Sequence, residues 1–126
     1  MVDKRSLEIS VLAHASILIG FLFRYSFIFP FLIWKTLKHS KYSERQSQQA
    51  AYYQVAALLL IMSISFGAEF IILLNESSNG IVQRVDATFI RQLELVVYSL
   101  LSLYALYGAY RCSRGEEFKY LLIGKL

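Results

Sequence analysis

The sequence predicts an all-α membrane protein: a bundle of three transmembrane helices, the first one kinked, followed by an amphipathic C-terminal tail. Two observations lead to this fold class. The chain is 56% hydrophobic and 17% charged, whereas soluble domains are about half apolar and a quarter charged. It also contains three apolar segments that are each long enough to cross a bilayer as a helix. With 126 residues, we expect a single membrane domain over residues 1–126.

The first predicted span covers residues 11–34. As a helix it would reach roughly 36 Å, enough to cross a hydrocarbon core of about 30 Å with some tilt. Proline lacks an amide hydrogen, and its ring clashes with the carbonyl four residues earlier, so we expect a kink between Ser26 and Pro30. The stretch is longer than the apolar region of a secretory signal, and we expect it to be retained.

The second predicted span covers residues 45–74 and is entered through a polar run. Ser43 and Gln46 have the spacing of a capping box, which predicts that the helix begins in the headgroup region. Tyr52 and Tyr53 follow where aromatic side chains gather at a membrane interface.

The third predicted span covers residues 87–110, behind Asp86 as a candidate N-cap. Gly108 and Ala109 near its end would let a neighbouring helix approach closely. The remaining residues, 111–126, alternate charges with aromatic and aliphatic side chains, and they are too few and too charged to cross a membrane. We therefore expect a cytoplasmic tail that lies along the membrane surface.

Lysine and arginine are distributed unevenly between the two sides of the predicted bundle. The linker after the first span and the C-terminal tail together hold Lys35, Lys38, Lys41, Arg45, Arg111, Arg114, Lys119 and Lys125. The opposite side holds only Lys4, Arg5, Arg84 and Arg91. By the positive-inside rule, this predicts a cytoplasmic linker and C-terminus with the N-terminus outside. Four linker residues are also candidates for contacts with anionic lipid headgroups: Lys35, Lys38, Lys41 and Arg45.

The sequence carries no recognisable catalytic or metal-binding pattern, so we expect neither an enzyme nor a cofactor. It has no glycine-rich phosphate loop, nucleophile–base pair or paired carboxylates. His14 and His39 lie too far apart in the predicted topology to share a metal ion, and the lone Cys112 cannot form an internal disulfide. The net charge of +4 is explained by membrane topology, so we do not expect a nucleic-acid partner.

Four charged residues fall within the apolar parts of the predicted spans: Arg24, Glu69, Arg91 and Glu94. A charge in hydrocarbon costs a few kcal/mol, so each needs a partner or water. Helix counting places Glu69 and Arg91 in the same outer third of the membrane, so we expect these two to pair rather than Glu69 and Arg24. The alternative to such structural pairs is a proton or substrate pathway through the membrane.

Several short motifs, taken in order, resemble the pattern of one family. They are Leu12-Ala13-His14, Pro30, the run 44–54, Tyr107-Gly108-Ala109-Tyr110 and the stretch 114–124. Together they resemble the small membrane domain shared by the twenty-kilodalton component of the chloroplast inner-envelope translocon and a set of uncharacterised bacterial proteins. The positions that fit are His14, Pro30, Gln49, Ala50, Gln54, Gly108, Arg114, Gly115, Phe118, Tyr120 and Gly124. The chain departs from the pattern at Gln46, Tyr52 and Leu121, where the family usually has His, Asn and Pro.

The resemblance implies a helical membrane protein and, for the plastid relatives, a part in a protein-conducting translocon. The bacterial relatives are the nearer comparison, because the acidic Asp3 and Glu8 argue against a transit peptide. We therefore expect a multi-pass protein of the bacterial inner membrane.

Three classes of function remain open from the sequence. The favoured one is a small accessory or assembly subunit of a larger membrane complex, because a thin bundle this rich in Tyr and Phe has more aromatic surface than it can bury. The second is an oligomeric pore or translocon component, and the third is a stand-alone lipid-interacting membrane protein. The expected partners are membrane lipids and other membrane protein subunits, with a hetero-complex favoured over a homo-oligomer.

Overall fold

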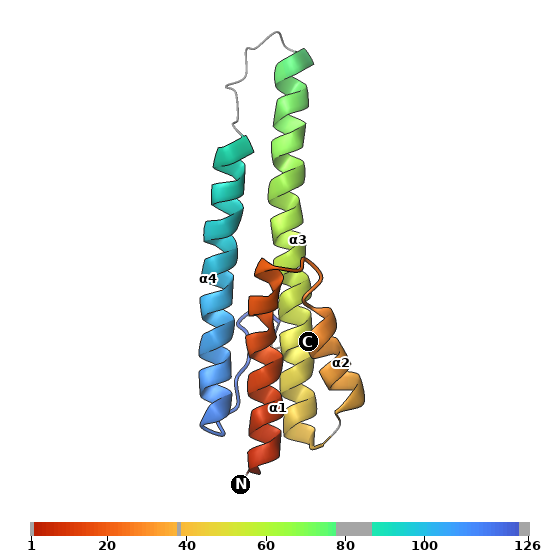
Figure 1. Ribbon diagram of the computed structural model, residues 1–126, viewed down its shortest axis with the longest axis vertical. Coiled ribbons are helices and arrows are strands. Elements are labelled where there is room, and N and C mark those ends of the chain that lie inside the picture. The colour runs from red at the N-terminus through yellow and green to blue at the C-terminus, as the bar shows by residue number, and fades with distance from the viewer. Residues whose placement is uncertain (1, 38, 78–86, 124–126) are drawn as a thin grey trace.

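The computed structural model describes residues 2–37, 39–77 and 87–123, and every regular element within them is a helix (Figure 1). In chain order these are α1 (Lys4–Ala15), the 3₁₀ helix η1 (Ser16–Phe21), α2 (Ile28–Thr36), α3 (Lys41–Ser77) and α4 (Ala87–Ser113). The two long helices α3 and α4 run side by side, while α1, η1 and α2 pack only against their lower halves (Figure 1). The predicted all-α class is confirmed for the described ranges.

Two of the described helices are long and apolar enough to cross a membrane: Lys41–Leu74 and Phe89–Ser113. In each, only 11% of the most apolar window is buried inside the protein. The core helix of a soluble protein would be mostly buried, so these side chains suit a lipid surrounding rather than water. The chain is a membrane protein. The third predicted crossing, residues 11–34, is not among these helices.

The stretch 11–34 folds as a helical hairpin and not as one kinked span, so this prediction was wrong. The chain rises through α1 and η1, reverses between residues 22 and 27, and descends again through α2 (Figure 1). Pro30 is the third residue of α2. An amide hydrogen in the first turn has no helical partner, so the proline costs this helix no hydrogen bond and helps to start it.

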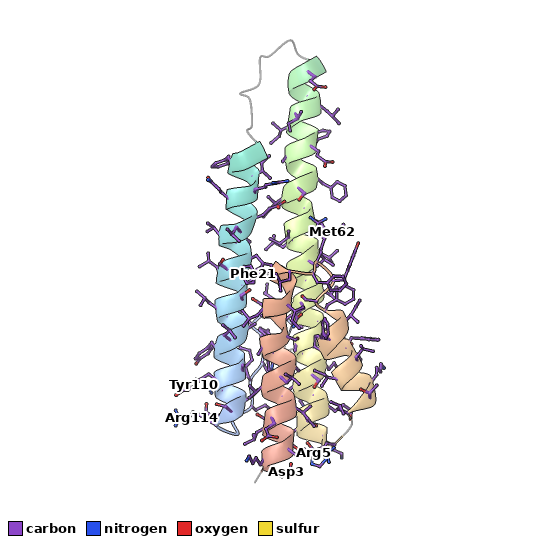
Figure 2. All side chains as sticks on the ribbon, viewed as in Figure 1. Asp3, Arg5, Phe21, Met62, Tyr110 and Arg114 are labelled. Carbon is purple, nitrogen blue, oxygen red and sulfur yellow. The ribbon has the colours of Figure 1, made fainter. Side chains whose placement is uncertain are left out.

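Because the hairpin returns, the N-terminus lies beside the linker and not across the membrane from it. His39 Nε2 is 2.6 Å from the Asp3 carboxylate, and the hydroxyls of Ser6 and Ser40 are 2.6 Å apart. In Figure 2, Asp3 and Arg5 lie at the same end of the bundle as Arg114. The prediction that the N-terminus and the linker face opposite compartments was therefore wrong. We call this shared end, which carries Asp3, His39 and Arg114, the basic end.

Helix α3 corresponds to the second predicted span, and it begins at Lys41, before the predicted start near residue 45. The Ser40 hydroxyl accepts a hydrogen bond from the Ser43 amide at 3.1 Å, so Ser40 rather than Ser43 caps α3. With 37 residues, α3 is roughly 55 Å long, well over the thickness of a hydrocarbon core. The candidate cap Asp86 of the third span lies outside the described residues.

The C-terminal segment does not lie on the surface, contrary to the prediction. Gly115 has a positive φ of 75°, and its amide donates to the Cys112 carbonyl at 3.0 Å, which ends α4 and reverses the chain. The Tyr42 hydroxyl then donates to the Glu116 carbonyl at 2.7 Å, and Arg45 is 2.5 Å from the Glu117 carboxylate. These contacts direct the segment back along α3, into the bundle.

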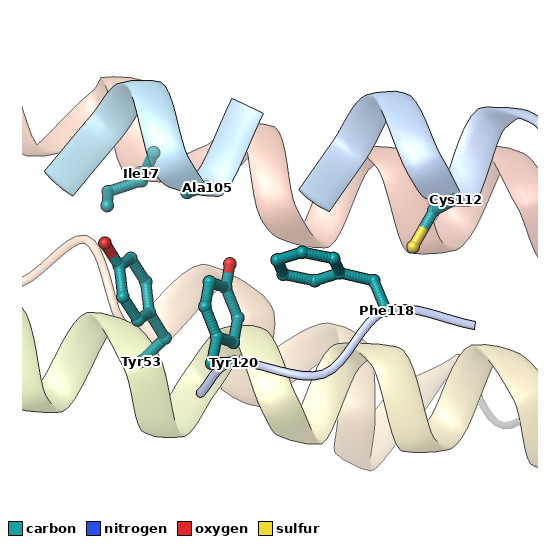
Figure 3. Close-up of a cluster of buried hydrophobic side chains, with 6 residues drawn as sticks. All are labelled: Ile17, Tyr53, Ala105, Cys112, Phe118 and Tyr120. Carbon is teal, nitrogen blue, oxygen red and sulfur yellow. The ribbon is translucent and has the colours of Figure 1, made fainter. Parts of the chain in front are cut away.

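The core of the bundle is built around two aromatic rings from this returning segment. Phe118 and Tyr120 lie between α3 and α4, next to Tyr53 and Ala105 (Figure 3). The rings of Tyr53 and Tyr120 are stacked with centroids 3.9 Å apart, and Phe118 meets Tyr120 edge-on at 4.9 Å. Small buried residues, Ala50, Ala57, Ala105 and Ala109, give the rings room between the long helices.

Candidate functional site

A buried polar cluster ties the first helix, α3, α4 and the C-terminal segment together. His14 Nδ1 lies 2.8 Å from the Tyr120 hydroxyl, and His14 Nε2 lies 3.1 Å from Gln46 Oε1. The Cys112 thiol donates to the same oxygen at 3.3 Å. All four side chains are fully buried or nearly so. We refer to these four residues as the His14 cluster.

Burial sets the protonation state of this cluster. It lowers the pKa of His14 to about 4, so the imidazole is neutral at physiological pH. Since Gln46 offers an oxygen to Nε2, that nitrogen carries the single proton and Nδ1 accepts from the Tyr120 hydroxyl. Burial also raises the pKa of Tyr120 well above its usual value, which keeps the hydroxyl a donor. The His14 cluster is therefore a neutral hydrogen-bonded network and not a charged centre.

A second polar group holds the reversal of the hairpin. The Gln54 side-chain amide on α3 is within 2.9 Å of the Ser16 hydroxyl and 3.1 Å of the Ser26 hydroxyl. From α4, the Tyr98 hydroxyl donates to the Ile17 carbonyl at 2.6 Å. These bonds satisfy polar groups of the 3₁₀ segment and of the turn that lipid could not satisfy.

Directly above the reversal lies a cavity of about 230 Å³, which we call the apex pocket. Three of its lining residues are charged and come from three different elements: Arg24 from the hairpin turn, and Arg91 and Glu94 from α4. The rest of its lining is Gly20, Phe21, Ser26, Gln54, Leu58, Ile61, Leu95 and Tyr98. The structure thus brings three of the four predicted intramembrane charges into one pocket.

The charges in the apex pocket are only partly compensated. The Ser65 hydroxyl donates a hydrogen bond to the Glu94 carboxylate. Among the described residues, Arg24 and Arg91 form no ion pair or hydrogen bond. Glu69 does not line the pocket, and its expected ion pair with Arg91 is not formed. The pocket lining therefore contains two guanidinium groups and one carboxylate.

Helix counting gives the depth at which we expect the apex pocket to lie in a bilayer. Trp34 and Tyr52, whose rings meet edge-on at 6.0 Å, are the aromatic pair expected at the lower membrane interface. Along α3, Leu58 is about 9 Å and Ser65 about 20 Å above Tyr52. In a hydrocarbon core of about 30 Å, Leu58 is then about one third and Ser65 about two thirds of the way across. In Figure 2, Phe21 at the hairpin tip lies somewhat below Met62 of α3.

The motif positions singled out in the sequence play different structural parts. His14, Phe118 and Tyr120 meet in the core, and Gly108 lies against the Phe118 ring. Gln49, Ala50 and Gln54 lie on the buried face of α3, Pro30 is in α2, and Arg114 and Gly115 form the turn after α4. Gly124 lies outside the described residues. Sequence reasoning did not assign Ser26, Ser65 or Tyr98 to a site, although polar residues inside apolar stretches are the signal that could have found them.

The candidate lipid-contact residues lie at the basic end. The Lys35 ammonium is 4.1 Å from the Trp34 ring centroid. Arg45 is engaged by Glu117, and its guanidinium holds the pKa of that carboxyl below its usual value. Lys41 is exposed, and Lys38 lies outside the described residues. Among the residues that the structure describes, no group of three or more His, Cys, Asp or Glu side chains could hold a metal ion.

Comparison with known proteins assigns the sequence to a different family from the one its motifs resemble. The model of the magnetosome magnetite crystal formation protein family, MamF/MmsF, matches residues 6–126. The resemblance to the chloroplast translocon component was therefore wrong, because it rested on motifs of a few residues each. No curated protein and no solved structure gave a match.

Proposed function

The chain belongs to the magnetosome magnetite crystal formation protein family, and from this premise we propose that it is a non-enzymatic membrane protein that assists magnetite formation. We propose further that it acts as an accessory subunit of a larger membrane protein complex. The observation that carries this second step is the part of the bundle above the hairpin, where only α3 and α4 are present (Figure 1).

This two-helix section, residues 61–77 of α3 and 87–97 of α4, leaves large side chains uncovered. Phe66 is 61% exposed, and four other large apolar residues are exposed to a similar degree: Phe70, Leu73, Phe89 and Leu95. Ala68 is buried, and it marks the seam between the two helices. A pair of helices can bury only this one seam, so the remaining faces are available to helices of another subunit.

Glu69 adds a specific reason to expect a protein partner. It lies exposed in the two-helix section and has no ion pair among the described residues. A carboxylate in the outer third of the bilayer costs less than one at its centre, but it still favours a cationic or hydrogen-bonding side chain of a partner over lipid.

The proposed orientation places the basic end in the cytoplasm of a bacterium, with the N-terminus now on the same side. Lys4 and Arg5 then join Lys35, Lys41 and Arg45 at that end, which strengthens the lysine and arginine asymmetry used in the sequence argument. Reporter fusions to both termini would test this. A cytoplasmic signal from both supports it, and an external signal from either one contradicts it.

Mild-detergent purification followed by mass measurement tests the accessory role. A stoichiometric foreign subunit supports it, a homo-oligomer would favour the pore alternative, and a monomer with bound lipid would favour a stand-alone role. Glu69→Gln should reduce recovery of the foreign subunit. Glu8→Gln, at the exposed i,i+4 pair with Lys4 at the basic end, is the matched control and should leave recovery unchanged.

A magnetosome-forming bacterium that lacks its own family member tests the part in magnetite formation. The chain should restore crystal dimensions measured by electron microscopy, and Glu69→Gln should restore them less well than Glu8→Gln. Crystals that stay unchanged although the protein is present at normal level in the membrane would refute the assignment of this role.

A further inference from the structure

We propose that the apex pocket is a water-filled vestibule that binds a small oxyanion, such as phosphate or a carboxylate, between Arg24 and Arg91. This inference rests on the pocket itself and does not depend on the proposed part in magnetite formation. Three features carry it: the balance of charge in the pocket, the side from which the pocket opens, and its size.

The charge balance in the pocket is positive. Arg24 and Arg91 contribute two guanidinium groups, which stay protonated in proteins, against the single carboxylate of Glu94. Glu94 already accepts a hydrogen bond from Ser65, and neither arginine is paired among the described residues. An unpaired charge within the apolar part of a bilayer requires water or a counter-ion. The missing counter-ion for this set is an anion, because one carboxylate facing two arginines repels a cation overall.

The hairpin tip closes the pocket toward the basic end. Its floor is the hairpin tip, sealed by the bonds of Gln54 to Ser26 and of Tyr98 to the Ile17 carbonyl. Below that floor Ile17 is fully buried, over the rings of the core. Above the floor, the described lining residues come from α3 and α4, among them Ile61, Arg91 and Glu94. We infer that water enters from the side opposite the basic end.

Size and donor geometry favour a small oxyanion over a bulky ligand. A water molecule takes about 30 Å³ of liquid volume, so a cavity of about 230 Å³ holds one such ion with a few waters. The planar fork of a guanidinium group matches the paired oxygens of phosphate or carboxylate. Two arginines from different elements, the hairpin turn and α4, can approach one such ion from two directions.

Charged thiol reagents measure the sign of the potential in the pocket directly. Ile61→Cys puts a thiol in the lining, and the wild-type chain, whose Cys112 is fully buried, gives the background rate. In vesicles of neutral lipid, an anionic methanethiosulfonate should modify Ile61→Cys about tenfold faster than a cationic one at low salt. Leu59→Cys, an exposed α3 neighbour outside the pocket lining, is the control and should react with neither reagent.

Removing the arginine charge should abolish the preference for the anionic reagent. Adding Arg24→Gln or Arg91→Gln to Ile61→Cys should bring the two rates close together, whereas Arg24→Lys should keep most of the difference. Inorganic phosphate should slow modification of Ile61→Cys, and it should no longer do so with either Gln variant. An unchanged melting temperature of each Gln variant shows that the fold is intact.

Four results would overturn the proposal. Equal rates for the two reagents would mean that Glu94 neutralises the arginines, and a faster cationic reagent would mean a cation site. No modification of Ile61→Cys would mean that the pocket is dry. Protection that requires an anionic lipid in the vesicle, with none from free phosphate in neutral lipid, would assign the arginines to a lipid headgroup instead.

Discussion

Replacing Gly108 by alanine tests how tightly the C-terminal segment packs against α4. A Cβ at this position would lie 2.7 and 2.8 Å from Cε1 and Cδ1 of the Phe118 ring, closer than carbon atoms can approach. The ring has little freedom to move, because Phe118 is 6% exposed and meets the rings of His14, Tyr104 and Tyr107 edge-on at 5.7, 5.7 and 5.9 Å. The Cβ must therefore displace either the C-terminal segment or α4.

Gly67 provides the matched control, because a Cβ there would meet nothing within 4 Å. Both glycines lie inside long helices, so both alanine variants gain the same helix propensity, about 1 kcal/mol. Overpacking in a filled core costs about 1–3 kcal/mol. Gly108→Ala should therefore be less stable than Gly67→Ala by about 1–3 kcal/mol, and Gly67→Ala should match or exceed the wild type.

The assay is unfolding in mild detergent, followed by circular dichroism, on the wild type and both variants. A second cycle in the Phe118→Leu background should show a smaller cost for Gly108→Ala, because the ring that causes the clash is gone. If Gly108→Ala is as stable as Gly67→Ala, the reasoning that the returning segment is wedged against α4 fails.

Three further predictions concern the His14 cluster and the turn that follows α4. The pKa of His14 is lowered from 6.5 to about 4, so the folded state favours the neutral imidazole. The free energy of unfolding should therefore be highest above about pH 6.5 and fall by about 3 kcal/mol as the pH approaches 4. In His14→Gln this pH dependence should be absent. Thermal unfolding at several pH values checks this, and a flat wild-type profile would contradict it. Tyr120→Phe removes the hydroxyl that His14 Nδ1 accepts from, and unfolding measurements should show a loss of about 1–3 kcal/mol. Gly115→Ala, at a φ of 75°, should cost about 1 kcal/mol, whereas Gly115→Asn should cost less; limited proteolysis of the C-terminal segment should be faster for the alanine variant, and equal rates would argue against the left-handed turn.

The sequence determined the all-α class of this protein. Apolar segments such as residues 87–110 are predicted to be helices that can cross a membrane, because length and hydropathy are properties of the segment alone. Gly108 was expected to let a neighbouring helix approach, whereas its close neighbour is the Phe118 ring of the non-helical C-terminal segment. Arg24, Arg91 and Glu94 could be singled out from the sequence because a charged side chain in hydrocarbon is costly, and this cost is also a property of the segment alone.

Only the tertiary structure decided whether residues 11–34 form one helix or turn back, and that the start of α1 lies beside the linker before α3. Whether residues 11–34 span or turn back depends on Gln54 and Tyr98, which lie far along the chain and satisfy the polar groups of the reversal. The same holds for the C-terminal segment, whose alternating pattern fits a surface helix until Tyr120 finds His14 and Tyr53 inside the bundle. Hydropathy counts the residues of one segment, whereas a reversal or an inserted ring depends on partners that the chain brings together only on folding.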